Sequence, residues 1–216
     1  MTVVLLVVTG VVAIGDWFAV HRRLVHLEYL LKPLTLVVLI AATATADLPV
    51  IKPWVLAALA FGLAGDIGLM LSDKHAEKPD LPFMLGLGSF LIGHVCYLAA
   101  FARYGIRGDS VIAGALIVGG VAVTALPKVL GGARKTGGQE LMAVVALYAA
   151  ALAAMAVLAV GTGSLATAAG GLLFLASDLF IAFERFVSPV KRGSLLVIST
   201  YHLAQVLIVV GLIASF

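Results

Sequence analysis

The stretch WVLAALAFGLAGDIGLML, residues 54–71, decides the fold class. It is long enough to cross a bilayer, because a membrane helix needs about 17–25 mostly apolar residues. Its one charged residue is Asp66. A carboxylate in hydrocarbon is costly, so an aspartate inside a span indicates a functional site. A second run, LLFLASDLFIA at residues 172–182, repeats the Leu-Ala-(Gly/Ser)-Asp pattern around Asp178. We therefore expect Asp66 and Asp178 to take part in the function.

The composition is that of an integral membrane protein. The chain has 216 residues, of which 62% are hydrophobic and 12% charged, whereas soluble domains are about 25% charged. We expect a single transmembrane helical domain over residues 1–216. The formal net charge of +3 comes from basic residues scattered through short loops, so no nucleic-acid partner is expected. The single cysteine, Cys96, excludes an intrachain disulfide. The N-terminus lacks a basic n-region, so residues 3–20 are expected to be a retained span.

About eight apolar stretches have the length of a membrane helix. They do not alternate polar and apolar positions as the strands of an outer-membrane barrel do. The predicted fold is therefore an all-α, polytopic helix bundle. The segment Gly131–Gly138 is expected to be a flexible loop between the fifth and sixth spans. The expected spans are 3–20, 31–46, 54–71, 83–102, 109–127, 140–160, 164–183 and 194–215.

Loop lysines and arginines set the expected orientation, because cytoplasmic loops are enriched in them. Eleven follow odd-numbered spans (Arg22, Arg23, Lys32, Lys74, Lys78, Lys128, Arg134, Lys135, Arg185, Lys191, Arg192), and three lie on the other side (Lys52, Arg103, Arg107). Both termini should therefore face away from the cytoplasm, in a multi-pass protein of the cell membrane.

This topology brings the polar side chains of six spans to similar depths. Both aspartates should lie roughly 10 Å below the cytoplasmic interface, by the rise of a helix. Lys32-Pro33 is expected to open the second helix, near the entrance. Tyr148 and Tyr201 would lie roughly 12 Å deep, and His94 and Gln205 roughly 18 Å deep. A polar cavity open to the cytoplasmic half would satisfy these groups.

Paired carboxylates at one depth suggest acid–base chemistry. One carboxyl would be neutral and the other ionised, which supplies a general acid and a general base in one site. The alternative is a pair of structural carboxylates, each capped by a lysine or a hydroxyl. The similarity between the two aspartate motifs also suggests that spans 1–4 and 5–8 are parallel repeats.

The other polar residues each allow a structural and a functional interpretation. His94 and Tyr97 are three apart and share a helix face, for packing, for holding a polar head group or for orienting a carboxylate. Lys32 either extends to the interface or supplies a cation for a phosphate or an aspartate. Tyr201 and Gln205 share a face, as interhelical contacts or as substrate ligands.

Two further features favour structural roles. Asp16 is expected to form an ion pair with Arg22 or Arg23. The histidines are too dispersed for a metal site, and the sequence has no HExxH motif and no cysteine cluster.

Taken in order, these residues resemble the YhhN-like family of membrane proteins, whose characterised animal members are lysoplasmalogenases. The resemblance spans nearly the whole chain. It is carried by Lys32-Pro-Leu34, Gly65-Asp66 with Leu69, Phe83, Gly86, Phe90, His94 and Tyr97, then Phe174, Ser177 and Asp178, and finally Tyr201 with Gln205. His202 stands where another aromatic residue would be expected.

The resemblance implies hydrolysis of the vinyl ether bond of a lysoplasmalogen, giving a fatty aldehyde and a glycerophosphoethanolamine or glycerophosphocholine. The lysophospholipid would enter from the bilayer, and no cofactor would be needed. Asp66 and Asp178 would be the catalytic acid and base, in either order. The expected substrate-binding residues are Lys32, His94, Tyr97, Tyr148, Ser177, Tyr201 and Gln205.

Two other functions remain open at this point. Intramembrane aspartates on parallel repeats would also suit a small proton-coupled transporter or channel. Against it, the polar groups cluster in one half of the membrane, and broken helices are not evident. A structural scaffold is the third possibility, and it leaves the paired aspartates unexplained.

Overall fold

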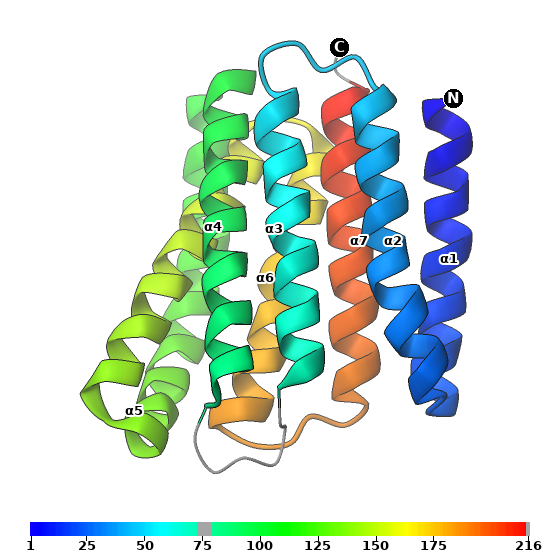
Figure 1. Cartoon of the computed structure of the whole chain (residues 1–216). Helices are drawn as coiled ribbons and strands as arrows, with labels where there is room; N and C mark the ends of the chain where they lie inside the picture. Colours follow the sequence, from blue (N-terminus) through cyan, green and yellow to red (C-terminus); the bar gives the residue numbers. More distant parts are fainter. Residues whose placement is uncertain (73–78, 215–216) are drawn as a thin grey trace.

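The computed structural model describes residues 1–72 and 79–214, and over these residues the chain is helical, without strands. The helices pack as a bundle, with α6 behind α3 and α4 (Figure 1). In chain order they are α1 Thr2–Arg22, α2 Val25–Thr45, α3 Lys52–Leu71, α4 Leu81–Tyr104, α5 Gly108–Gly161, α6 Leu165–Phe186 and α7 Gly193–Ile213. The prediction of an all-α, polytopic membrane bundle is confirmed, since each helix is long and apolar enough to cross a membrane.

Local sequence explains where several helices begin and end. The Asp80 carboxylate accepts a hydrogen bond from the Phe83 backbone N–H at 3.0 Å and caps α4. The Ser164 hydroxyl accepts one from the Thr167 N–H at 3.4 Å and caps α6. Both residue types suit helix N-termini, where backbone donors have no intrahelical partner. Arg23 closes α1 in the left-handed conformation, at a φ of 57°. The turn to α2 is therefore short, and α1 and α2 are neighbours.

The described helices number seven, where the sequence analysis predicted eight. The expected spans 109–127 and 140–160 both lie within α5, which is 54 residues long. A straight helix of that length would measure about 80 Å, more than twice a bilayer core. The backbone of α5 leaves helical dihedral angles at Gly137 and Gly138. There it folds into two limbs that lie side by side (Figure 1), so that α5 crosses the membrane twice.

The predicted loop over Gly131–Gly138 is therefore wrong for most of its length, because the helix continues to Thr136 and breaks only at the last two glycines. At Gly132 an added Cβ would lie 1.9 Å from the Phe186 carbonyl oxygen. The first glycine pair thus allows α5 to approach the end of α6 closely. The second pair makes the turn: Gly138 has a φ of 73°, which side chains other than glycine rarely adopt.

The start of α2 also differs from the prediction. The helix begins at Val25, and Lys32 lies about two turns inside it. Pro33 is within the helix and removes one backbone hydrogen bond, and α2 changes direction in its lower half (Figure 1). The Tyr29 hydroxyl donates to the Met70 carbonyl oxygen at 2.7 Å and joins the early turns of α2 to the end of α3.

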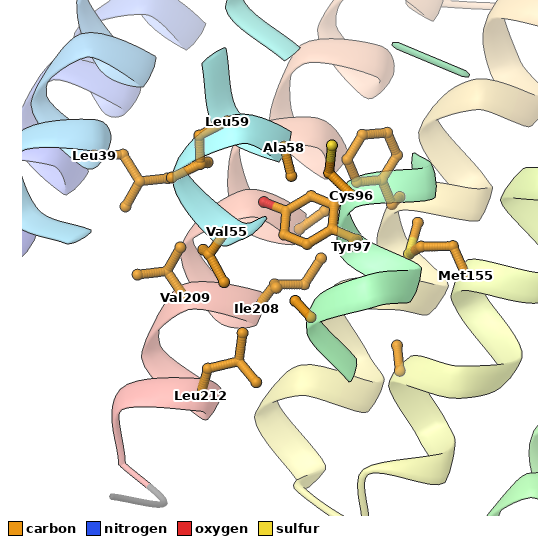
Figure 2. Packing of buried hydrophobic residues seen from close by; sticks show 14 of the residues in the cluster. Leu39, Val55, Ala58, Leu59, Cys96, Tyr97, Met155, Ile208, Val209 and Leu212 are labelled. Carbon is orange, nitrogen blue, oxygen red and sulfur yellow. The ribbon is translucent and has the colours of Figure 1, made fainter. Parts of the chain in front are cut away.

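The apolar core is built around Tyr97. Figure 2 shows side chains from α2, α3, α4, α5 and α7 packed against one another there, including Leu39, Leu59, Met155 and Leu212. These side chains are almost completely buried. They fix the helices relative to one another, so that the polar residues of neighbouring helices are held at defined positions.

Both described ends of the chain lie at the same end of the bundle (Figure 1). Asp66 lies about 8 Å from the opposite end of α3, and Asp178 about 12 Å from the corresponding end of α6. Two basic residues counted for the orientation, Lys74 and Lys78, lie outside the described residues, as does residue 215 at the end of the last expected span. The proposed parallel repeats stay a prediction.

Candidate active site

Asp66 is held by a buried ion pair. The Lys32 Nζ atom on α2 lies 3.3 Å from Asp66 Oδ1 on α3, and the side chains are only 13% and 3% exposed. The other carboxylate oxygen, Oδ2, has no hydrogen-bond partner among the described residues. Lys32 therefore offsets the charge of Asp66, while Oδ2 can accept a hydrogen bond from a bound molecule.

Asp178 has a different environment. The Tyr148 hydroxyl on the second limb of α5 donates to Asp178 Oδ2 at 2.5 Å. His94 Nε2 on α4 lies 3.7 Å from the same oxygen, which is too long for a hydrogen bond. In the described part of the chain Asp178 has no ion pair with a lysine or arginine. The two aspartates thus differ: one is paired with a cation, and the other contacts a phenol and an imidazole.

Aromatic rings connect the two aspartates into one cluster. The Phe174 ring packs edge-on against His94 at 4.9 Å and against Tyr201 at 5.4 Å between centroids. The Tyr201 hydroxyl interacts electrostatically with Asp66, without hydrogen-bond geometry. A continuous path of contacts therefore runs from Asp178 through His94, Phe174 and Tyr201 to Asp66.

Gln205 and Tyr97 extend the cluster away from the aspartates. The Tyr97 hydroxyl donates to Gln205 Oε1 at 2.5 Å and so links α4 to α7. An added Cβ at Gly62 would lie 3.0 Å from the Tyr201 hydroxyl and 3.1 Å from Gln205 Nε2. Tyr201 and Gln205 therefore share a face against α3, as predicted. The importance of Gly62 was missed, although its position one turn before Asp66 is the signal that could have indicated it.

Ser177 lies beside Asp178 in the chain, but its hydroxyl points to another partner. It donates to the Val197 carbonyl oxygen on α7 at 3.0 Å, and the side chain is buried. In this structure Ser177 joins α6 to α7.

Several buried polar atoms around the aspartates have no hydrogen-bond partner among the described residues. They are Asp66 Oδ2, both ring nitrogens of His94, the Tyr201 hydroxyl and Gln205 Nε2. Buried polar groups are usually hydrogen-bonded, to protein or to water. Their concentration here indicates a place for water and for the polar groups of a ligand.

Asp178 and Tyr148 also line an apolar cavity. The cavity has a volume of about 200 Å³ and lies between the two limbs of α5 and α6. A smaller space of about 50 Å³, between Phe83, Phe90 and Phe186, reaches the same two residues. The site therefore joins a polar cluster to an apolar chamber.

The predicted ion pair of Asp16 with Arg22 or Arg23 is wrong. Asp16 is completely buried, and neither carboxylate oxygen has a hydrogen-bond partner in the described chain. Arg22 instead lies over the Phe18 ring, 5.8 Å from its centroid. Asp16 faces the bundle and interacts electrostatically with Lys32. Arg22 and Arg23 stand nearly two helical turns after Asp16, and Arg22 packs on Phe18, so the inward-facing carboxylate is left without an arginine partner.

No group of three or more histidine, cysteine, aspartate or glutamate side chains that could hold a metal ion occurs within residues 1–72 and 79–214. The described residues therefore form a site with three parts. These are the Asp66 carboxylate paired with Lys32, the Asp178 carboxyl group without a cationic partner, and the apolar chamber that Asp178 lines.

Comparisons with known proteins give a consistent result. Residues 27–212 match the sequence model of the YhhN family. Lysoplasmalogenase TMEM86A of Bos taurus is 33% identical over 169 residues, which are 73% of this chain and 64% of the relative. Lysoplasmalogenase TMEM86B of Sus scrofa is 32% identical over 129 residues, 58% of this chain and 52% of the relative.

The human TMEM86A lysoplasmalogenase is 30% identical over 169 residues, again 73% of this chain and 64% of the relative. The matched region therefore covers less than two thirds of these relatives' length. No solved structure matches the chain significantly.

Proposed function

Because the chain belongs to the YhhN family, we propose that it hydrolyses the vinyl ether bond of a lysoplasmalogen that enters from the bilayer. The products are a fatty aldehyde and the glycerophospho-alcohol. The observation that carries the proposal is the joint burial of two differently partnered carboxyl groups, Asp66 and Asp178, in one cluster. The names of the curated relatives support the same reaction.

The partners of the two carboxyl groups favour a division of roles. Lys32 stabilises the charged form of Asp66 at 3.3 Å. Asp178 is buried without a lysine or arginine partner in the described chain, and an uncompensated buried carboxyl favours its neutral form. Since Asp178 Oδ2 accepts the Tyr148 hydrogen bond, Oδ1 is free to carry the proton. We therefore assign Asp178 as the general acid and Asp66 as the general base.

The reaction then proceeds in two balanced stages. Asp178 transfers its proton to the β-carbon of the vinyl ether, and the electron pair of the ether oxygen forms an oxocarbenium ion. The carboxylate of Asp66 stabilises this cation and takes a proton from the water that attacks it. The resulting hemiacetal loses its hydroxyl proton to Asp178, while Asp66 protonates the departing glycerol oxygen. Both residues return to their starting states. Two carboxyl groups with room for water act similarly in inverting glycosidases.

The remaining predicted site residues have distinct parts in this proposal. Lys32, Tyr201 and Gln205 present polar atoms to the phosphate and glycerol oxygens. Tyr148 holds Asp178 through its hydrogen bond, and His94 lies beside the same carboxyl oxygen. Tyr97 positions Gln205 through its hydrogen bond, and Ser177 positions α6 against α7.

The orientation belongs to the proposal as well. The end of the bundle that holds the aspartates also holds the described basic residues Arg22, Arg23, Arg134, Lys135 and Lys191. By the positive-inside rule this end faces the cytoplasm of a cell-membrane protein, and both termini face the other side. The orientation can be tested by fusing to each terminus a reporter enzyme that is active only outside the cytoplasm. Both fusions should be active.

The test of the function is an aldehyde assay. Purified protein in detergent is incubated with a lysoplasmalogen in the presence of EDTA, and aldehyde release is measured. We expect turnover, with no turnover of the saturated alkyl ether analogue. Asp66→Asn and Asp178→Asn should each lower the rate at least about a hundredfold, the low end for loss of a general acid or base.

Asp109→Asn is the matched control, since Asp109 is exposed at the other end of the bundle, with 71% of its side chain accessible. It should retain the rate of the unmodified protein. Near-normal turnover by both Asp66→Asn and Asp178→Asn would overturn the mechanism. Absence of aldehyde, together with ion-driven flux in liposomes, would instead favour a proton-coupled transporter.

A further inference from the structure

The cavity between α5 and α6 owes its volume to small side chains. Alanines line it from three directions: Ala122 and Ala125 on the first limb of α5, Ala149 and Ala153 on the second limb, and Ala182 on α6. Protein interiors are normally packed without large voids. An opening of about 200 Å³ in a described bundle of this size is therefore a candidate ligand site.

The chemistry of the lining selects the kind of ligand. Apart from Tyr148 and Asp178, which are hydrogen-bonded to each other, the lining residues are alanine, valine and leucine. Apolar cavities of this kind stay dry and take up apolar molecules. The chamber extends along the first limb from Val118 to Val129, about 16 Å by helical rise, which suits an extended chain.

The cavity wall includes an exposed residue. Ala150 lines the cavity and is itself exposed. A lipid chain could therefore enter sideways, without passing through water.

The position of Asp178 at this chamber fits one direction of binding. The Phe174 ring packs against both Tyr201 and His94, between Asp66 and Asp178 along the path of contacts. Lys32, Tyr201 and Gln205, which carry the other polar atoms, do not line the chamber. A lipid with its phosphate among those groups and its chain in the chamber would bring the chain side of the ether bond to Asp178. The β-carbon that must be protonated is on that side.

We propose that the α5–α6 chamber binds the aliphatic chain of the ether lipid and that its alanines set the chain length the protein accepts. This inference rests on the proposed function for its substrate, and it adds the binding site and its specificity residues. The bilayer is itself apolar, so the chamber selects by its length and shape and not by removing the chain from water.

The first test is a chain-length profile. Ala153→Leu and Ala122→Leu place larger side chains in the deeper part of the chamber, away from Val129. Ala154→Leu is the matched control, because Ala154 is exposed and is not part of the lining. With vinyl ether substrates of short and long chains, the first two variants should lower kcat/KM for the long chain at least about tenfold relative to the short chain. The control should leave the ratio unchanged.

The second test does not require turnover. A non-hydrolysable alkyl lysophospholipid with a photoreactive group at the end of its chain should label peptides from 118–129 or 145–153, and Ala153→Leu should abolish that labelling. Labelling of other peptides, or an unchanged chain-length ratio in an active Ala153→Leu protein, would overturn the proposal that the chamber binds the lipid chain. The proposed hydrolysis would not be affected by either result. Labelling at these peptides in a protein that releases no aldehyde supports the chamber and overturns the proposed reaction.

Discussion

Removing the cation beside Asp66 should destabilise the protein strongly. In Lys32→Met the carboxylate loses its ion pair at 3.3 Å, while Oδ2 already lacks a hydrogen-bond partner among the described residues and the side chain is 3% exposed. Breaking a buried pair from one side costs about 3–5 kcal/mol. For a chain of this size such a loss lowers Tm by about 10 °C.

The double variant provides the magnitude of the interaction itself. Lys32→Met with Asp66→Asn removes both charges, and replacing a whole buried ion pair is often nearly neutral. We therefore expect the double variant to recover most of the stability, with a coupling energy of about 2 kcal/mol or more in the double-mutant cycle.

Cys96 allows this measurement without added labels on the surface. It is the single cysteine of the chain and is buried, so a thiol-reactive fluorescent dye reports unfolding in detergent. Lys52→Met is the control, since Lys52 forms no ion pair within the described residues, and it should change stability by less than about 0.5 kcal/mol. Equal stability of Lys32→Met and the unmodified protein, or a double variant as unstable as the single one, would refute the reasoning.

Two further predictions use the same unfolding assay. Tyr97→Phe leaves Gln205 Oε1 buried without its donor, so it should cost about 1–3 kcal/mol; unchanged stability would mean that another donor replaces the phenol. Gly138→Ala should cost about 1–3 kcal/mol because of its φ of 73°. Gly131→Ala meets no atom within 4 Å and should be neutral or stabilising. If Gly131→Ala lowered the free energy of unfolding more than Gly138→Ala does, the assignment of the turn to Gly137 and Gly138 would be contradicted.

Much of the fold follows from the sequence, because a bilayer admits few structures. Apolar runs such as residues 54–71 must be helical to satisfy their own backbone groups. Their observed boundaries mostly lie within a few residues of the predicted ones. There are two exceptions. The helix α2 begins at Val25 and not near Lys32, and the first limb of α5 continues to Thr136, well past the predicted end at residue 127. A proline is common at a first helical position, but it is also tolerated inside a membrane helix, and the sequence does not distinguish these cases.

The turn inside α5 shows what the sequence leaves open. Two glycine pairs stand close together, at residues 131–132 and 137–138, and both are typical of a loop. Packing distinguishes them, because Gly132 lies within the helix against the backbone of Phe186, and only Gly137 and Gly138 leave helical dihedral angles. That contact joins distant parts of the chain, and no local pattern indicates it.

For the polar residues of the site, too, the sequence predicts part of the arrangement, and contacts between distant helices decide the rest. The depths of these residues could be worked out by counting residues along each helix. An aspartate as the partner of Lys32 was one of three interpretations, beside a phosphate and extension to the interface, and the sequence did not say which aspartate. The direction of each side chain depends on the rotation of its helix, which packing decides. This is why Ser177 meets Val197 and why Asp16 faces inward and does not reach Arg22. The α5–α6 chamber depends on three separate segments and has no local signal.

The glycine turn of α5 also decides whether the chain crosses the membrane an odd or an even number of times before α6. With one crossing for α5, α6 and α7 would run in the opposite sense through the membrane. Asp178 would then lie toward the end of the bundle opposite to that of Asp66, and the two carboxyl groups would not belong to one cluster. Because Gly137 and Gly138 return the chain to the side from which α5 began, α6 runs parallel to α3. The placement of both aspartates toward the same end of the bundle is thus a consequence of a two-residue reversal far from either of them in the sequence.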